Sequence, residues 1–131
     1  MIEGFKIPNV TFKVREGDTA ENQETCSVGG KWIEKNTDDF FKGKRVILFS
    51  LPGAFTPTCS SQQLPGFESN FTKIKDLGID EVYCCSVNDS YVMNEWAKKM
   101  GISNIKLIPD GSGPVSYTHL RAHETCHKLV C

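Results

Sequence analysis

The pattern of apolar and polar residues along the chain predicts three buried strands. They are short, apolar-rich runs over residues 46–51, 82–87 and 105–108. The first run shows no alternation of apolar and polar residues, so both of its faces must be covered. A strand of that kind belongs in the middle of a parallel or mixed sheet.

Two segments between these strands have the spacing of amphipathic helices. The first follows Cys59 and ends at Gly78. Its apolar stripe comprises Leu64, Phe67, Phe71, Ile74 and Leu77. The second begins after the capping pair Asn88 and Asp89 and ends at Gly101. Its stripe comprises Met93, Trp96 and Met100.

The order strand, helix, strand, helix, strand predicts a three-layer α/β domain with right-handed crossovers. Ahead of these elements, residues 10–14 alternate like a half-exposed strand, and residues 16–30 form a polar loop or weak hairpin. Residues 37–43 form a short helical turn capped by Thr37. The length of 131 residues suits a domain with a single core.

Composition and charge narrow the possible functions. The formal net charge of −1 offers no electrostatic footprint for nucleic acid or for an anionic membrane. No apolar run approaches the about 20 residues that a membrane-spanning helix requires. The first residues lack the basic flank and apolar region of a signal peptide, so we expect a cytoplasmic protein whose six cysteines stay reduced.

Cys59 is the candidate nucleophile, because it lies between a buried strand and the start of a helix. The unpaired N–H groups and partial positive charge of a helix N-terminus stabilise a thiolate, which is the reactive form of cysteine. The preceding loop, residues 52–58, contains two prolines, a glycine and two threonines. That composition disfavours burial in a core and indicates a functional thiol.

Other thiol chemistries lack their second group. A Cys-x-x-Cys redox pair is absent, because Gln62 and Thr56 occupy the positions three residues away from Cys59. A cysteine hydrolase needs a histidine base, and no histidine precedes His119. What remains is a solitary thiolate that attacks a bond with a good leaving group. A peroxide O–O bond fits, because the resulting sulfenic acid can be reduced again.

Two motifs carry a family resemblance. Pro52-x-x-x-Thr56-x-x-Cys59 resembles the active-site signature of the peroxiredoxins, and the segments 51–60 and 87–96 are similar to their type II branch. The resemblance covers approximately residues 4–113. It implies a thioredoxin-like fold and thiol-dependent reduction of hydrogen peroxide and alkyl hydroperoxides. It implies no prosthetic cofactor, with glutathione, glutaredoxin or thioredoxin as electron donor, and it is compatible with a homodimer.

The resemblance also implies roles for individual residues. Cys59 would be the peroxidatic cysteine and would pass through a sulfenic acid. Thr56 would hydrogen-bond the peroxide, Pro52 would shield the thiolate from water, and backbone N–H groups near Thr58 would hold the peroxide oxygens. No resolving cysteine is evident. Cys84 and Cys85 lie in a predicted buried strand, and Cys26 lies in a loop.

The chain departs from the family pattern after Gly113. The arginine that the family carries on a later strand is not matched by Arg45 or Arg121. We therefore divide the chain into an incomplete domain, 1–113, and a tail, 114–131, that resembles foreign sequence, and we expect the fold to be truncated at its C-terminal end.

Two alternatives to a peroxidase remain. One is a redox sensor or inactive thioredoxin-like domain that has lost turnover with its arginine. The other is a metal-binding tail, because His123 and His127 match the His-Glu-x-x-His pattern of zinc proteases and His119 adds a third candidate ligand at helical spacing. Only four residues follow His127. A zinc-protease helix needs a surrounding domain, so we expect no metal site.

Overall fold

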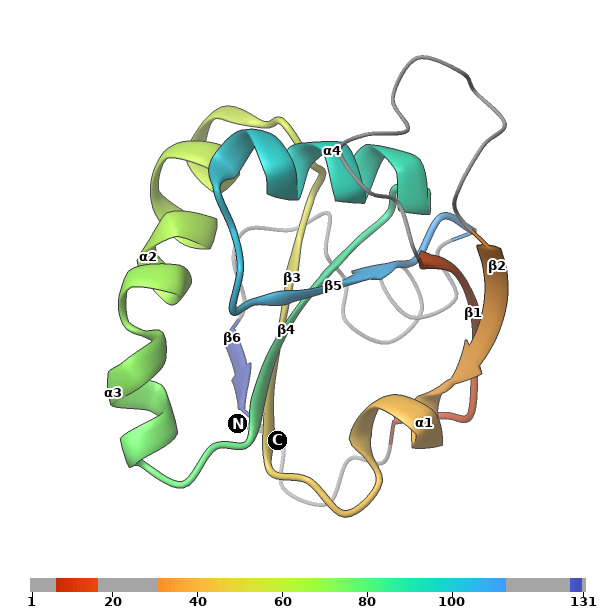
Figure 1. Cartoon of the computed structure of the whole chain (residues 1–131), viewed down its shortest axis with the longest axis horizontal. Helices are drawn as coiled ribbons and strands as arrows, with labels where there is room; N and C mark the ends of the chain where they lie inside the picture. The colour runs from red at the N-terminus through yellow and green to blue at the C-terminus, as the bar shows by residue number, and fades with distance from the viewer. Residues whose placement is uncertain (1–6, 17–30, 113–127, 131) are drawn as a thin grey trace.

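The computed structural model describes residues 7–16, 31–112 and 128–130. Its centre is a four-stranded sheet in the order β5-β4-β3-β6 (Figure 1). The strands are β3 (Val46–Leu51), β4 (Glu81–Ser86), β5 (Lys106–Pro109) and β6 (Lys128–Val130). The first three are parallel, which confirms the three predicted strands, and β6 runs antiparallel to β3.

Successive residues of β3 and β4 point to opposite faces of this sheet. Phe49 lies opposite Cys84, and Ser50 lies opposite Cys85. Phe49 and Cys84 belong to one buried cluster, whereas Cys85 belongs to a second cluster together with Leu48. Both faces of the central strands are therefore covered, as their apolar sequence requires.

Both crossovers place their helices on the face that carries Phe49 and Cys84. A π-helical turn (Cys59–Gln63), α2 (Leu64–Ser69) and α3 (Phe71–Asp76) connect β3 to β4, and α4 (Ser90–Met100) connects β4 to β5. The strand order continues in one direction through both connections, so right-handed crossovers put the helices on the same side (Figure 1). Side chains from both connections fill this cluster, among them Leu64, Met93 and Trp96.

The other face is covered by a hairpin and a short helix. β1 (Thr11–Glu16) pairs antiparallel with β2 (Lys31–Asn36), and α1 (Thr37–Phe41) follows directly. Phe12 and Phe40 pack edge to face and join the cluster on this side of the sheet. The three-layer α/β arrangement is thus confirmed. Strand β2 was not predicted from the sequence.

The helix ends follow the predicted capping rules with one exception. Asp89 caps α4 by accepting from the Val92 N–H at 3.0 Å, and Gly101 ends that helix in the left-handed conformation with φ of 66°. The cap of α1, however, is Asn36 and not Thr37. The Thr37 hydroxyl instead donates to the Pro8 carbonyl and ties the chain entering β1 to α1.

The single helix predicted after Cys59 is interrupted twice. Pro65 has no N–H to continue an α-helical ladder, and the residues before it adopt the wider π-helical turn. A second break falls at Asn70. Leu77 is 76% exposed, so its assignment to the buried stripe was wrong. No helix in the described part of the chain is long and apolar enough to cross a membrane.

Candidate active site

Cys59 lies just past the carboxyl end of β3, in the first turn of the helical segment 57–69. Pro57 opens this segment, where a missing N–H costs nothing. The Ser60 N–H donates to the Thr56 carbonyl at 3.0 Å and closes the first turn. The N–H groups of Thr58 and Cys59 precede any intrahelical acceptor, so they are available to an anion at the positive end of the helix dipole.

The Cys59 side chain is buried, with 4% of its surface exposed. The expectation that the polar loop would keep this thiol out of the core was wrong. The loop itself faces solvent, but the first helical turn directs the thiol inward, into the cluster that contains Leu51, Leu64 and Trp96.

Hydrogen bonds hold the loop between β3 and Cys59 in place. The Thr56 hydroxyl donates to the Gly53 carbonyl at 2.8 Å. The carboxamide oxygen of Asn88 accepts from the Ala54 N–H at 2.9 Å and from the Ser86 hydroxyl at 2.7 Å. The loop is therefore fixed to the end of β4. Because the Thr56 proton is engaged in this bond, the hydroxyl keeps only its capacity to accept a further hydrogen bond.

Phe55 in this loop and Lys99 beside it were not predicted from the sequence as site residues. Phe55 is 49% exposed and has φ of 62°, a left-handed conformation that a bulky residue rarely adopts. Its ring centre lies 6.4 Å from that of Trp96, and the Lys99 ammonium lies 5.7 Å from the Phe55 ring centre. Lys99 thus brings a cation to the loop that precedes the thiol.

Cys84 and Cys85 are buried in β4, as predicted, and are free thiols. Cys84 shares the cluster of Cys59, and Cys85 faces the other side of the sheet. Burial raises the pKa of Cys84 well above its ordinary value, and the neighbouring thiols Cys85 and Cys59 add to the rise. Cys84 is therefore a protonated, unreactive thiol at neutral pH. Cys26 lies outside the described residues.

Arg45 is not near the candidate site. Its N–H donates to the Asp80 carboxylate at 2.7 Å, just before β3 begins, whereas Cys59 follows the opposite end of that strand. Arg121 and the tail histidines lie outside the described residues. Within the described ranges, no group of three or more histidine, cysteine or acidic side chains could hold a metal ion.

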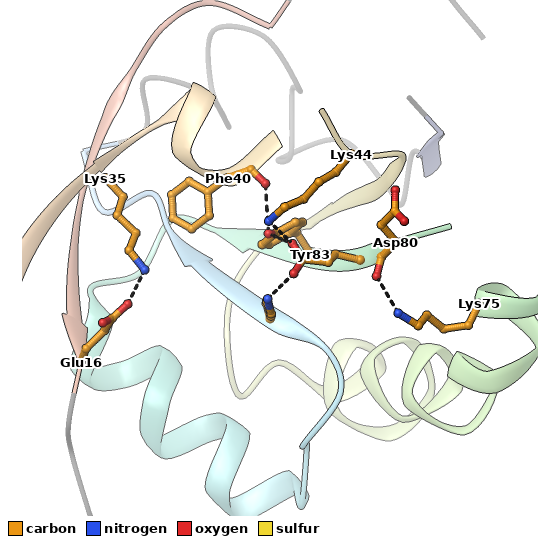
Figure 2. A network of polar contacts seen from close by, with 9 residues as sticks. Glu16, Lys35, Phe40, Lys44, Lys75, Asp80 and Tyr83 are labelled. Carbon is orange, nitrogen blue, oxygen red and sulfur yellow. Dashed lines mark hydrogen bonds and ion pairs between the residues drawn. The ribbon is translucent and has the colours of Figure 1, made fainter. Parts of the chain in front are cut away.

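A second polar cluster lies at the amino ends of the parallel strands. The Glu81 carboxylate accepts from Lys44, Lys106 and the Tyr83 hydroxyl, and Tyr83 also donates to the Phe40 carbonyl at 3.1 Å (Figure 2). These bonds join the starts of β3, β4 and β5. The cluster is therefore a structural clamp at the end of the sheet remote from Cys59.

Residues 3–118 match the Redoxin family, so the chain belongs to that family. The chain is similar to peroxiredoxins. It is 55% identical over 112 residues to a peroxiredoxin of Rhizobium etli, a match that covers 82% of this chain and 59% of the relative. It is 45% identical to the hybrid peroxiredoxin of Haemophilus influenzae, covering 86% of this chain and 42% of the relative. The chain thus spans about half the length of these relatives.

Solved structures give the same assignment. The 1-Cys peroxiredoxin of Plasmodium falciparum superposes with a TM-score of 0.69 at 38% identity, covering 82% of this chain and 61% of that structure. Reduced Prx3 of Vibrio vulnificus, solved in complex with hydrogen peroxide, gives 0.74 at 30% identity, covering 89% and 64%. The fold is therefore thioredoxin-like, as the sequence motifs implied.

Proposed function

We propose that this chain is a thiol-dependent peroxidase that reduces hydrogen peroxide and alkyl hydroperoxides through Cys59. The observation that supports this most directly is the placement of Cys59 in the first helical turn, behind a loop fixed by Thr56 and Asn88. The similarity to peroxiredoxins of several organisms supports it independently.

The oxidation step uses Cys59, the peroxide and a proton from solvent. The Cys59 thiolate attacks the terminal, hydrogen-bearing oxygen of the peroxide, the O–O bond breaks, and the departing alkoxide or hydroxide takes up a proton from solvent. Cys59 becomes a sulfenic acid. The Thr58 and Cys59 N–H groups would stabilise charge on the peroxide oxygens. Thr56 would accept a hydrogen bond from the peroxide, while Pro52, which is itself exposed, would border the approach.

A second thiol must return Cys59 to its reduced state. A reductant thiol condenses with the sulfenic acid to a mixed disulfide and water, and a further thiol then releases the Cys59 thiolate as the reductant disulfide forms. We propose a one-cysteine cycle with glutathione, glutaredoxin or thioredoxin as donor. The high pKa of the Cys84 thiol favours an external reductant over this neighbour. We also propose that the chain can associate with a second copy as a homodimer.

The cellular compartment that we propose is based on the thiol-dependent cycle. Cys59, Cys84 and Cys85 are free thiols in the structure. A catalytic cycle that depends on a reduced cysteine and on cellular thiols suits a reducing compartment, so we propose the cytoplasm.

Mass spectrometry after single turnover tests the nucleophile. Equimolar peroxide is added in the presence of a sulfenic-acid trap, and the labelled cysteine is identified. We expect the label on Cys59, loss of peroxide consumption in Cys59→Ser, and retention in the matched control Cys84→Ser. Predominant labelling of Cys84 or Cys85 would contradict the assignment. Slow oxidation of every thiol would favour the alternative of a redox sensor or inactive domain.

A further inference from the structure

Glu68, near the end of α2, binds a segment far from it in sequence. Its carboxylate accepts hydrogen bonds from three consecutive backbone N–H groups, those of Ser103 at 3.1 Å, Asn104 at 3.0 Å and Ile105 at 3.1 Å. The Ser103 hydroxyl and the Asn104 carboxamide also donate, at 3.0 and 2.9 Å. One carboxylate therefore fixes α2 to the segment 103–105, which leads into β5.

The ionisation of Glu68 agrees with this geometry. Partial burial alone would raise its pKa, but the bonds from Ser103, Asn104 and Ile105 outweigh burial, and the pKa lies below its ordinary value. Such bonds to a charged acceptor are stronger than those to a neutral one. The contact is thus a charge-assisted anchor at neutral pH.

Glu68 belongs to the same helical segment as Cys59. Residues 57–69 are helical throughout, although the winding changes from π-helical to α-helical at Leu64, so the anchor near one end and the thiol near the other belong to one helical segment. Between them lies the π-helical turn Cys59–Gln63, a geometry that is rarely favourable in isolation. Beyond that turn, Leu64 is fully buried, and Phe67 stacks on Phe49 with ring centres 4.0 Å apart. The contacts of α2 therefore stabilise the π-helical turn that precedes it.

The burial of Cys59 gives this support a consequence for the reaction, if the proposed function holds. Only 4% of the Cys59 surface is exposed, which restricts access to its sulfur more for a bulky reductant thiol than for a peroxide. Local opening of the segment 57–69 would relieve this restriction.

We propose that Glu68 is a positioning residue for Cys59. Its hydrogen bonds to the segment 103–105 keep the helical segment 57–69 folded against the sheet. The folded segment limits the access of larger thiols to the Cys59 sulfur. Losing the carboxylate lowers the cost of local opening without changing the approach that peroxide uses. The inference rests on the proposed function for its kinetic meaning, but the access of the thiol can be measured without any peroxide.

The test compares Glu68→Gln with the matched control Glu95→Gln. The first substitution replaces one carboxylate oxygen by an amide donor that faces a cluster of N–H donors, whereas Glu95 makes an exposed pair with Lys98 on α4. The reduced full chain is alkylated with N-ethylmaleimide, and the modification of Cys59 and Cys85 is followed by mass spectrometry. Cys85 is the internal reference, because it is buried in the cluster on the opposite face of the sheet, and opening of the segment 57–69 leaves that cluster covered.

We expect Glu68→Gln to raise the alkylation rate of Cys59 about three- to tenfold, within the strength of a partly exposed, charge-assisted contact. The rate for Cys85 should stay unchanged, as should both rates in Glu95→Gln. Ser103→Ala, which removes one of the donors, should give a smaller rise at Cys59. Amide hydrogen exchange across residues 60–69 should accelerate by a similar factor.

Two outcomes would overturn the proposal. An equal rise at Cys59 and Cys85 would mean that Glu68 only contributes to global stability. An unchanged rate at Cys59 would mean that the anchor fixes the segment 103–105 alone. In single-turnover assays, Glu68→Gln should leave peroxide consumption unchanged and accelerate reduction by thiols. If the parent chain consumes no peroxide, the proposed function fails, while the alkylation ratio still decides the role of Glu68.

Discussion

The indole N–H of Trp96 donates to the hydroxyl of Ser60 at 3.0 Å, and this bond joins α4 to the residue that follows Cys59. Trp96 is fully buried, so its N–H has lost its bond to water and depends on Ser60. The bond thereby fixes the turn that carries the thiol from the side of α4.

A double-mutant cycle can measure this bond. We expect Trp96→Phe and Ser60→Ala each to destabilise the fold, and the coupling energy between them to be about 0.5–1.5 kcal/mol, the usual net value of a neutral hydrogen bond. Chemical denaturation of the four proteins provides the values. A coupling energy near zero would mean that Trp96 acts only through packing.

Thr56 provides a prediction on reactivity. Thr56→Val keeps the shape of the side chain but removes the hydroxyl. The variant loses the hydrogen bond to the Gly53 carbonyl and the oxygen that would accept a hydrogen bond from a peroxide. If a bond of roughly 1.5–3 kcal/mol is lost in the transition state, the second-order rate constant with peroxide should fall by about one to two orders of magnitude.

Thr56→Ser serves as the control for this prediction, because it retains the hydroxyl. Its rate constant, measured by stopped-flow peroxide consumption, should stay within a few-fold of the parent. Equal rates for the valine variant and the parent would show that Thr56 only shapes the loop.

The central strands were predictable because their signal is local. Consecutive apolar residues such as those of Val46–Leu51 need cover on both faces wherever they occur, and Asp89 and Gly101 mark the ends of α4 by their own side chains and backbone freedom. Strand β2 was missed because its partner β1 lies across residues 17–30, and pairing at that separation leaves no local mark. Thr37 was misassigned as a cap because its hydroxyl found a tertiary partner in Pro8.

In the candidate site, too, local features were predictable from the sequence and tertiary contacts were not. Cys59 was singled out by its position between a strand and a helix, and Thr56 by the family motif. The structure confirms that Cys59 lies in a helical first turn. The burial of its side chain depends on how that turn packs against Leu51 and Trp96, which no local pattern contains. The anchor of Glu68 was equally invisible, because its partners begin 35 residues later in the chain.

Phe55 carries a prediction on backbone strain. A left-handed conformation costs a residue with a Cβ roughly 1–2 kcal/mol, and glycine avoids this cost. Phe55→Gly and Phe55→Ala both remove the ring from Trp96 and Lys99, so the difference between them isolates the backbone. We expect the glycine variant to be more stable than the alanine variant by about 1 kcal/mol in thermal or chemical denaturation.

The control position for this comparison is Glu95, which is exposed within α4. There the order should reverse, with alanine more stable than glycine by about 1 kcal/mol, because glycine weakens a helix interior. If alanine is also preferred at position 55, the loop does not adopt the left-handed conformation in solution.

Glu81 provides a prediction on pH. Burial would raise its pKa, but hydrogen bonds from Lys106, Tyr83 and Lys44 outweigh burial and lower the pKa from 4.5 to about 2. The folded-state pKa lies below the unfolded value, so the charged clamp stabilises the fold fully above about pH 4.5, and this stabilisation is lost as the pH falls toward about 2. Tyr83 stays protonated throughout, because burial and then the bond to Glu81 raise its pKa above the ordinary value.

The expected result is a stability that decreases with acid in the parent and decreases less in Glu81→Gln over the same interval. At neutral pH, Glu81→Gln should be less stable than the parent, because Lys44 and Lys106 then share no counter-charge. Urea denaturation at a series of pH values from about 2 to about 7 measures both effects, with Glu16→Gln as control, since the Glu16 pair with Lys35 is more exposed. Parallel pH curves for the parent and Glu81→Gln would show that the clamp does not carry the acid sensitivity of the fold.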